Sequence, residues 1–141
     1  MKSKDIIRLA KSIKKEWGAD PIEIAHRLGI VVLDEWETSL TDFTAQTLKI
    51  GNLPTIISIN KNYSDFAKKL LCAHELGHAI LHEDMAVNHF TDANTQTEAE
   101  ANLFALTLIG DENLEDSLCM PLIDMDGSML KAIMDYNIQK Y

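Results

Sequence analysis

Residues 72–78 read Cys72-Ala-His-Glu-Leu-Gly-His78, a His-Glu-x-x-His pattern inside a segment with helical periodicity. Residues four apart in a helix lie one turn apart on one face, so His74 and His78 could share one metal ion. Glu75 falls on the flank beside them, where its carboxylate could hold a water molecule and accept its proton. We therefore interpret His74 and His78 as zinc ligands and Glu75 as the general base of a peptidase.

The surroundings of the two histidines support this interpretation, since a five-residue pattern can also arise by chance. On a helical wheel Lys68 and Lys69 point away from His74, while apolar residues gather around it, namely Ala67, Leu70, Leu71 and Leu81. The alternative is a pair of histidines that binds no metal. We disfavour it, because two imidazoles on an apolar face beside a glutamate have few other ways to satisfy their nitrogens.

A catalytic zinc ion needs a third protein ligand and one open position, and a second predicted helix offers two carboxylates. This helix opens within Thr95-Gln-Thr-Glu-Ala-Glu-Ala-Asn-Leu-Phe104. Glu98 lies on one side of its wheel, and Glu100 lies on the other among Leu103, Phe104 and Leu108. Either could close a capping box, Glu98 with Thr95 or Glu100 with Thr97. We favour Glu100 as the third ligand, because a carboxylate on an apolar face needs a cation, and we give the capping box to Glu98.

The other histidines have weaker claims to the site. His82 lies about 12 Å from His74 along a continuous helix, too far for both to bind one ion, so we expect it near the terminal carbonyls of that helix. We expect His89 to be a solvated loop residue, and His26 has less claim still. The oxyanion-stabilising group is not fixed by the sequence; the candidates are Tyr63, His89 and Tyr136.

Helical and strand patterns follow one another in an order typical of the α+β class. Besides the two helices already described, we expect helices over residues 3–17, 20–29 and 127–138 and strands over 30–33, 43–50 and 55–59. A polar loop is expected over residues 83–96. The sequence therefore predicts one domain over residues 1–141, with N-terminal helices, a small and mostly antiparallel sheet, the metal helix packed on it, and further C-terminal helices.

Composition narrows the class of protein further. The chain has 141 residues, of which 46% are hydrophobic, which is enough for one domain with its own hydrophobic core. Its net charge of −9 argues against a surface that binds nucleic acid. Cys72 and Cys119 are too few for a disulfide framework, so we expect reduced thiols and a cytoplasmic protein. No signal-like or membrane-spanning apolar run is found. The sequence does not determine the oligomeric state.

Two segments carry a resemblance to a known family. His74-Glu-Leu-Gly-His-Ala-Ile-Leu-His82, followed by Glu98-Ala-Glu-Ala-Asn-Leu-Phe-Ala105, resembles the ImmA/IrrE family of metallo-endopeptidases. The resemblance also takes in Asp20–Ile30 and Pro54–Asn60. It implies a zincin-like fold with Zn2+ held by His74, His78 and Glu100, and Glu75 as general base. It further implies that an edge strand beside the metal helix holds the substrate; residues 43–50 or 55–59 could serve, although a purely structural strand fits either one equally well.

The same resemblance implies a protein substrate. In this family the substrate would be a transcriptional repressor of the helix-turn-helix type, encoded nearby on a mobile element or in a stress-response locus, and its cleavage would switch on genes. We expect residues 1–141 to contain no separate DNA-binding domain. One alternative is a non-proteolytic metal-binding regulator that acts by binding a repressor; Glu75 argues against it, because a structural zinc site needs no general base. Another is a peptidase of small peptides, which would need no protein partner.

Overall fold

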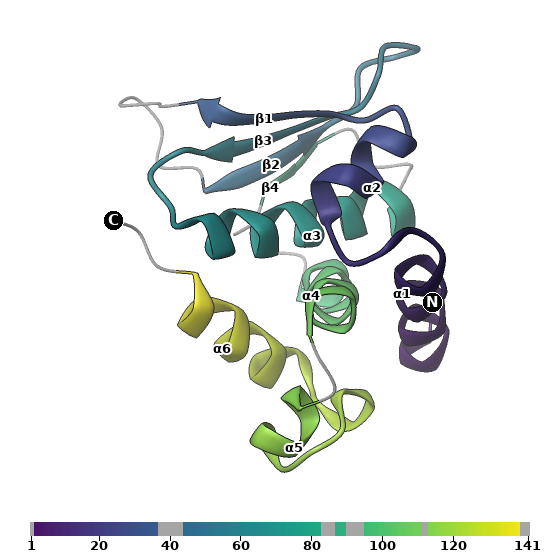
Figure 1. Cartoon of the computed structure of the whole chain (residues 1–141), viewed down its shortest axis with the longest axis vertical. Coiled ribbons are helices and arrows are strands. Elements are labelled where there is room, and N and C mark those ends of the chain that lie inside the picture. Colours follow the sequence, from purple (N-terminus) through teal and green to yellow (C-terminus); the bar gives the residue numbers. More distant parts are fainter. Residues whose placement is uncertain (1, 37–43, 83–86, 90–94, 111–112, 139–141) are drawn as a thin grey trace.

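The computed structural model describes residues 2–36, 44–82, 87–89, 95–110 and 113–138. A four-stranded sheet lies against one side of the long helix α3 (Asp65–Leu81), and helix α4 (Thr95–Ile109) lies on the other side (Figure 1). Helices α1 (Ser3–Trp17) and α6 (Gly127–Asn137) both contact α4. The α+β class predicted from the sequence is therefore confirmed, with the predicted metal helix between the sheet and the second helix.

The sheet has the strand order β1-β3-β2-β4. Its strands are β1 (Val31–Trp36), β2 (Ala45–Leu48), β3 (Ile56–Asn60) and β4 (Val87–His89). Strand β3 pairs with β1 in parallel and with β2 in antiparallel orientation, and β2 also pairs with β4 in antiparallel orientation. The sheet is thus mixed and mostly antiparallel in its pairings.

The structure bears on two expectations about the strands. Residues 43–50 and 55–59 had two equally open interpretations, an edge strand that holds the substrate or a purely structural strand. They contain β2 and β3, each of which has a neighbour on both sides, so the second interpretation applies. The edges of the described sheet are β1 and β4. Strand β4 lies inside the predicted loop 83–96, of which residues 83–86 and 90–94 fall outside the described residues. Residue 43 falls outside them as well.

Helix α3 begins and ends with specific capping contacts. The Ser64 hydroxyl accepts a hydrogen bond from the Ala67 amide at 3.1 Å, which satisfies a donor of the first turn. At the other end, Lys49 Nζ donates to the carbonyl oxygens of Ala79 at 3.3 Å and His82 at 3.2 Å. A cation at this end also opposes the negative pole of the helix dipole. Lys49 therefore fills the role that the sequence analysis gave to His82.

Gly77 lets α3 and α4 approach each other closely. A Cβ atom at this position would lie 3.2 Å from Phe104 Cδ1 and 3.3 Å from the Cα of Ala101, which is tighter than nine in ten Cβ contacts. The two helices cross steeply in Figure 1, where α3 runs across the view and α4 is seen nearly end-on. The crossing point lies within the His-Glu-x-x-His segment, so side chains from α4 reach the two histidines.

The N-terminal helices follow the prediction closely. Helix α1 buries Ile6 and Ala10, and Lys14 Nζ donates to the Gly110 carbonyl at 2.6 Å, just beyond the end of α4. Helix α2 (Pro21–Arg27) begins after Asp20, whose side chain accepts from the Ile22 amide at 3.1 Å. The side chain of Asp20 therefore caps this short helix.

The C-terminal part contains one predicted and two unpredicted elements. Helix α6 buries Leu130 and Met134, so these residues belong to the core. The short helix α5 (Leu114–Leu118) and the 3-10 turn η1 (Leu122–Asp124) were not predicted. Within the ranges that the structure describes, no helix is both long enough and apolar enough to cross a membrane.

Candidate metal centre

His74 and His78 lie next to each other on the face of α3 that meets α4. Their Nε2 atoms are 3.2 Å apart, and the rings meet edge to face with centroids 4.8 Å apart. Both side chains are fully buried. The four-residue spacing thus brings the two imidazoles together, as the sequence predicts.

Glu98 brings a carboxylate from α4 to both rings. Its Oε2 lies 3.1 Å from His74 Nε2, and its Oε1 lies 3.1 Å from His78 Nε2. In the described ranges this is the one group of three such residues whose candidate ligand atoms all lie within 4.8 Å of one another. Two imidazole nitrogens and a carboxylate are donors that zinc prefers.

The sequence analysis favoured Glu100 at this position, whereas the structure places Glu98 there. Glu100 Oε1 lies 2.8 Å from His82 Nε2, away from the pair of donors that Glu98 joins. The helical wheel could not decide between the two carboxylates, because every residue from Ala101 to Leu108 is buried and α4 has no single apolar face. The sequence analysis gave Glu98 a capping box, whereas in the structure both oxygens of its carboxylate face the two histidines.

The electrostatics of Glu98 favour its ionised form. Burial alone would raise the pKa of this carboxyl, but hydrogen bonds with His74 and His78 outweigh burial and hold the pKa below its usual range. An ionised carboxylate is the form that binds a metal cation.

Asn102 holds the outer nitrogen of His74. Its Oδ1 accepts from His74 Nδ1 at 2.7 Å, and both side chains are buried. A neutral ring that donates from Nδ1 keeps a lone pair on Nε2, which faces Glu98. The sequence analysis missed this residue. The sequence did offer one indication that Asn102 lies near the site: it follows Glu98 by four residues, and residues at that spacing share a helix face.

The donor set fits a divalent metal. With a hydrogen on Nε2, His74 donates to Glu98; once the ring is neutral and its hydrogen lies on Nδ1 facing Asn102, the Nε2 lone pair and the two Glu98 oxygens are all acceptors directed into one small buried region. Acceptors that converge without a cation repel one another, and burial strengthens that repulsion. A metal ion held by His74, His78 and Glu98 would satisfy all of them.

Glu75 lies beside this group and is anchored by the sheet. It is fully buried, and its Oε2 lies 3.7 Å from His74 Nε2. Thr47 on β2, also fully buried, donates from Oγ1 to Glu75 Oε1 at 3.0 Å. Thr47 Oγ1 also lies 3.1 Å from the main-chain carbonyl oxygen of Glu75. The strand therefore fixes one carboxylate oxygen and leaves the other on the side of the donors. The sequence offered no signal for Thr47, because the contact depends on how β2 packs on α3.

Replacing Thr47 by Val should reduce cleavage by about 10- to 100-fold in kcat, because a hydrogen bond to a charged group contributes about 1.5–3 kcal/mol. Valine keeps the shape of threonine and removes only the hydroxyl. The measurement is the rate of substrate cleavage at saturating substrate, with metal content and circular dichroism checked in parallel. Thr47→Ser is the matched control and should keep most of the rate; an unchanged kcat in Thr47→Val would show that the hydroxyl does not position Glu75.

Of the other candidates whose side chains the structure describes, none joins the metal donors. His26 is exposed on α2, and His89 lies in β4. Tyr63 and Thr44 share a hydrogen bond of 3.2 Å, and Tyr136 is 78% exposed on α6. The free thiols differ, since Cys119 is exposed whereas Cys72 is buried, and burial raises the pKa of the Cys72 thiol far above its usual range. None of these contacts adds a residue to the metal centre.

A site in which three protein donors can hold a metal ion beside a buried glutamate is the type of site found in metallopeptidases. The chain belongs to the peptidase M78 family, described as the IrrE N-terminal-like domain, whose model matches residues 25–118, about two thirds of the chain. The match includes every residue of the site and confirms both the resemblance and the zincin-like character of the fold. No curated protein and no solved structure matches the chain.

Proposed function

We propose that this chain is a zinc-dependent endopeptidase that cuts one specific protein. The observation that carries the proposal is the buried carboxylate of Glu75 beside the converging donors of His74, His78 and Glu98. A zinc site with a purely structural role has four protein ligands and no need of such a carboxylate. The described residues bring three donors together, which is the number that a catalytic zinc site uses.

The residues divide the chemistry between them. Zinc held by the three donors would polarise the scissile carbonyl and lower the pKa of a water molecule to about 7. Glu75 accepts the proton of the attacking water and then delivers it to the leaving amine. Thr47 keeps Oε1 of Glu75 in place, so that Oε2 is the oxygen that meets the water.

The substrate that we propose is a helix-turn-helix transcriptional repressor in the cytoplasm, whose cleavage would switch on genes of a mobile element or a stress-response locus. Family membership supports this choice. So does the net charge of −9, because DNA-binding proteins carry basic surfaces that an acidic protein attracts. An extended segment of the substrate would add to the sheet at β4, the edge strand next to β2, which carries Thr47.

Co-expression with the repressor-like product of the adjacent gene should give cleavage at a single site. We expect the purified pair to reproduce that cut, a chelator to stop it, and added zinc to restore it. Mass spectrometry of the fragments identifies the bond. Glu23→Gln is a matched control, because Glu23 is an exposed carboxylate on α2 that pairs with Arg27 and is not one of the metal donors, and it should cleave like the wild type.

The substrate specificity that we propose is tested with proteins that are unrelated to a repressor. Unfolded casein should be cut slowly or not at all, since selectivity is proposed to depend on docking of a folded partner. Rapid digestion of casein would make the chain a general peptidase. Rapid turnover of short peptides without a partner would favour a small-peptide peptidase instead.

A further inference from the structure

His78 is connected to Glu100 through a third histidine. The Nδ1 atoms of His78 and His82 are 2.9 Å apart, and His82 Nε2 lies 2.8 Å from Glu100 Oε1. His82 is only 7% exposed, and the Glu100 side chain is 14% exposed. The sequence analysis placed His82 too far from His74 to share a metal, and the structure gives it a different position, behind the ring of His78.

The direction of the hydrogen bonds in this chain follows from Glu100. A carboxylate only accepts, so a neutral His82 donates from Nε2 and keeps a lone pair on Nδ1. That lone pair can only accept, so His78 donates from Nδ1. The lone pair of His78 then lies on Nε2, on the side of the metal centre; in the metal-free protein Glu98 Oε1, 3.1 Å away, competes for a hydrogen on that atom, and a bound metal removes this competition. The reverse order would set the lone pair of His82 Nε2 against Glu100 and place a hydrogen on His78 Nε2.

We propose that His82 and Glu100 are positioning residues that hold His78 with its Nε2 lone pair directed at the metal. The inference rests on the proposed function, because it assigns a role in the same centre. Partners of this kind fix the tautomer and the orientation of a metal-binding ring. His74 is held by the neutral amide of Asn102, so the two imidazoles are oriented by different chemistry.

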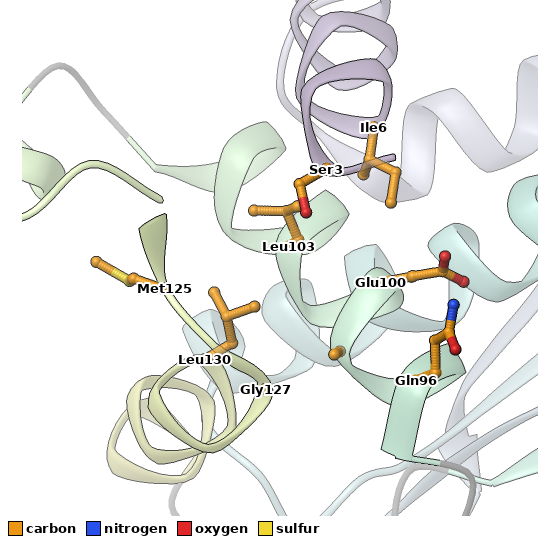
Figure 2. Close-up of a pocket in the computed structure, with 9 residues that line it drawn as sticks. Ser3, Ile6, Gln96, Glu100, Leu103, Met125, Gly127 and Leu130 are labelled. Atoms are coloured by element: carbon orange, nitrogen blue, oxygen red, sulfur yellow. The ribbon is translucent and has the colours of Figure 1, made fainter. Parts of the chain in front are cut away.

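The surroundings of Glu100 make a clean substitution possible. Glu100 lines a pocket of about 200 Å³ between α1, α4 and α6, so an amide can replace its carboxylate without entering a tightly packed region. Figure 2 shows Gln96 one turn earlier on α4, with its side chain beside that of Glu100. Gln96→Ala is therefore a matched control: it changes the same pocket wall and leaves the contact between His82 and Glu100 unaltered.

The first measurement reads the tautomer of His82 in the zinc-loaded wild-type protein by nitrogen-15 NMR. We expect a hydrogen on Nε2, directed at Glu100, and a lone pair on Nδ1, directed at His78. In Glu100→Gln the amide can donate as well as accept, so the preference for this tautomer should weaken. A hydrogen mainly on Nδ1 of His82 in the wild type would overturn the inference without any variant having to fold.

The second measurement is zinc affinity, determined by competition with a chromophoric chelator. Glu100→Gln and His82→Phe should each weaken binding by about 10- to 100-fold, the usual effect of losing such a partner. The double variant should lose little more than His82→Phe alone, because Glu100 acts through His82, and Gln96→Ala should bind like the wild type. Unchanged affinity in both single variants would overturn the positioning role, whereas a wild type that binds no zinc would overturn the proposed function itself.

Discussion

Glu75→Gln is expected to lower kcat for cleavage by about 10²- to 10⁴-fold, the usual contribution of a positioned general base. Glutamine keeps the size of the side chain and can still accept from Thr47, but it cannot take a proton from water. Zinc content and thermal stability should stay near those of the wild type, because Glu75 is not one of the three converging donors. Single-turnover cleavage assays with a zinc-loaded variant give the rate.

The same variant separates the two classes of function. Expressed in cells beside the repressor, Glu75→Gln should fail to switch on the regulated genes, while the control Glu23→Gln should succeed. If Glu75→Gln induced those genes as well as the wild type does, the protein would act by binding the repressor, and the non-proteolytic regulator would be the better explanation.

Glu98→Gln is expected to weaken zinc binding by more than 100-fold, beyond the roughly 10- to 100-fold effect of losing a residue that only supports a ligand. The reason is geometric, since each Glu98 oxygen lies 3.1 Å from one of the two Nε2 atoms. Chelator competition and the metal-to-protein ratio after dialysis measure the loss. Cleavage should fall with the zinc content.

Glu100→Gln is the matched comparison for this prediction, because both changes remove one carboxylate from the same helix. It should bind zinc more tightly than Glu98→Gln does. Full zinc binding in Glu98→Gln together with loss in Glu100→Gln would reinstate the ligand set favoured from the sequence. Equal losses in both variants would show that the two carboxylates cannot be distinguished by their positions in α4.

The part of the site that lies on one helix could be predicted from the sequence. The spacing of His74 and His78 places their rings on one face, and Glu75 follows from the same geometry. The part that depends on a second element could not. Helix α4 is buried on all sides over residues 101–108, so its rotation about its own axis is set by packing against α1, α3 and α6. That rotation decides between Glu98 and Glu100.

The sheet shows the same division. Apolar and β-branched runs indicated β1, β2 and β3, but which strand lies at an edge depends on pairing between distant segments. Strand β4 has three residues, Val87–His89, too few for an alternating pattern to be recognised. The contact of Thr47 with Glu75 is likewise a property of how β2 lies on α3. Local pattern therefore predicted most of the helices and strands, and tertiary packing decided which of them contact one another.

Gly77 has a consequence for anyone who would rebuild this site in another protein. The glycine sits within the His-Glu-x-x-His segment at a position that contributes no donor, and α4 lies so near that a Cβ atom there would be 3.2–3.3 Å from atoms of Ala101 and Phe104. Grafting His74, Glu75 and His78 onto a foreign helix would transfer the chemical groups without the clearance that brings Glu98 within reach. The smallest transplantable unit is therefore a crossed pair of helices with a glycine at the crossing.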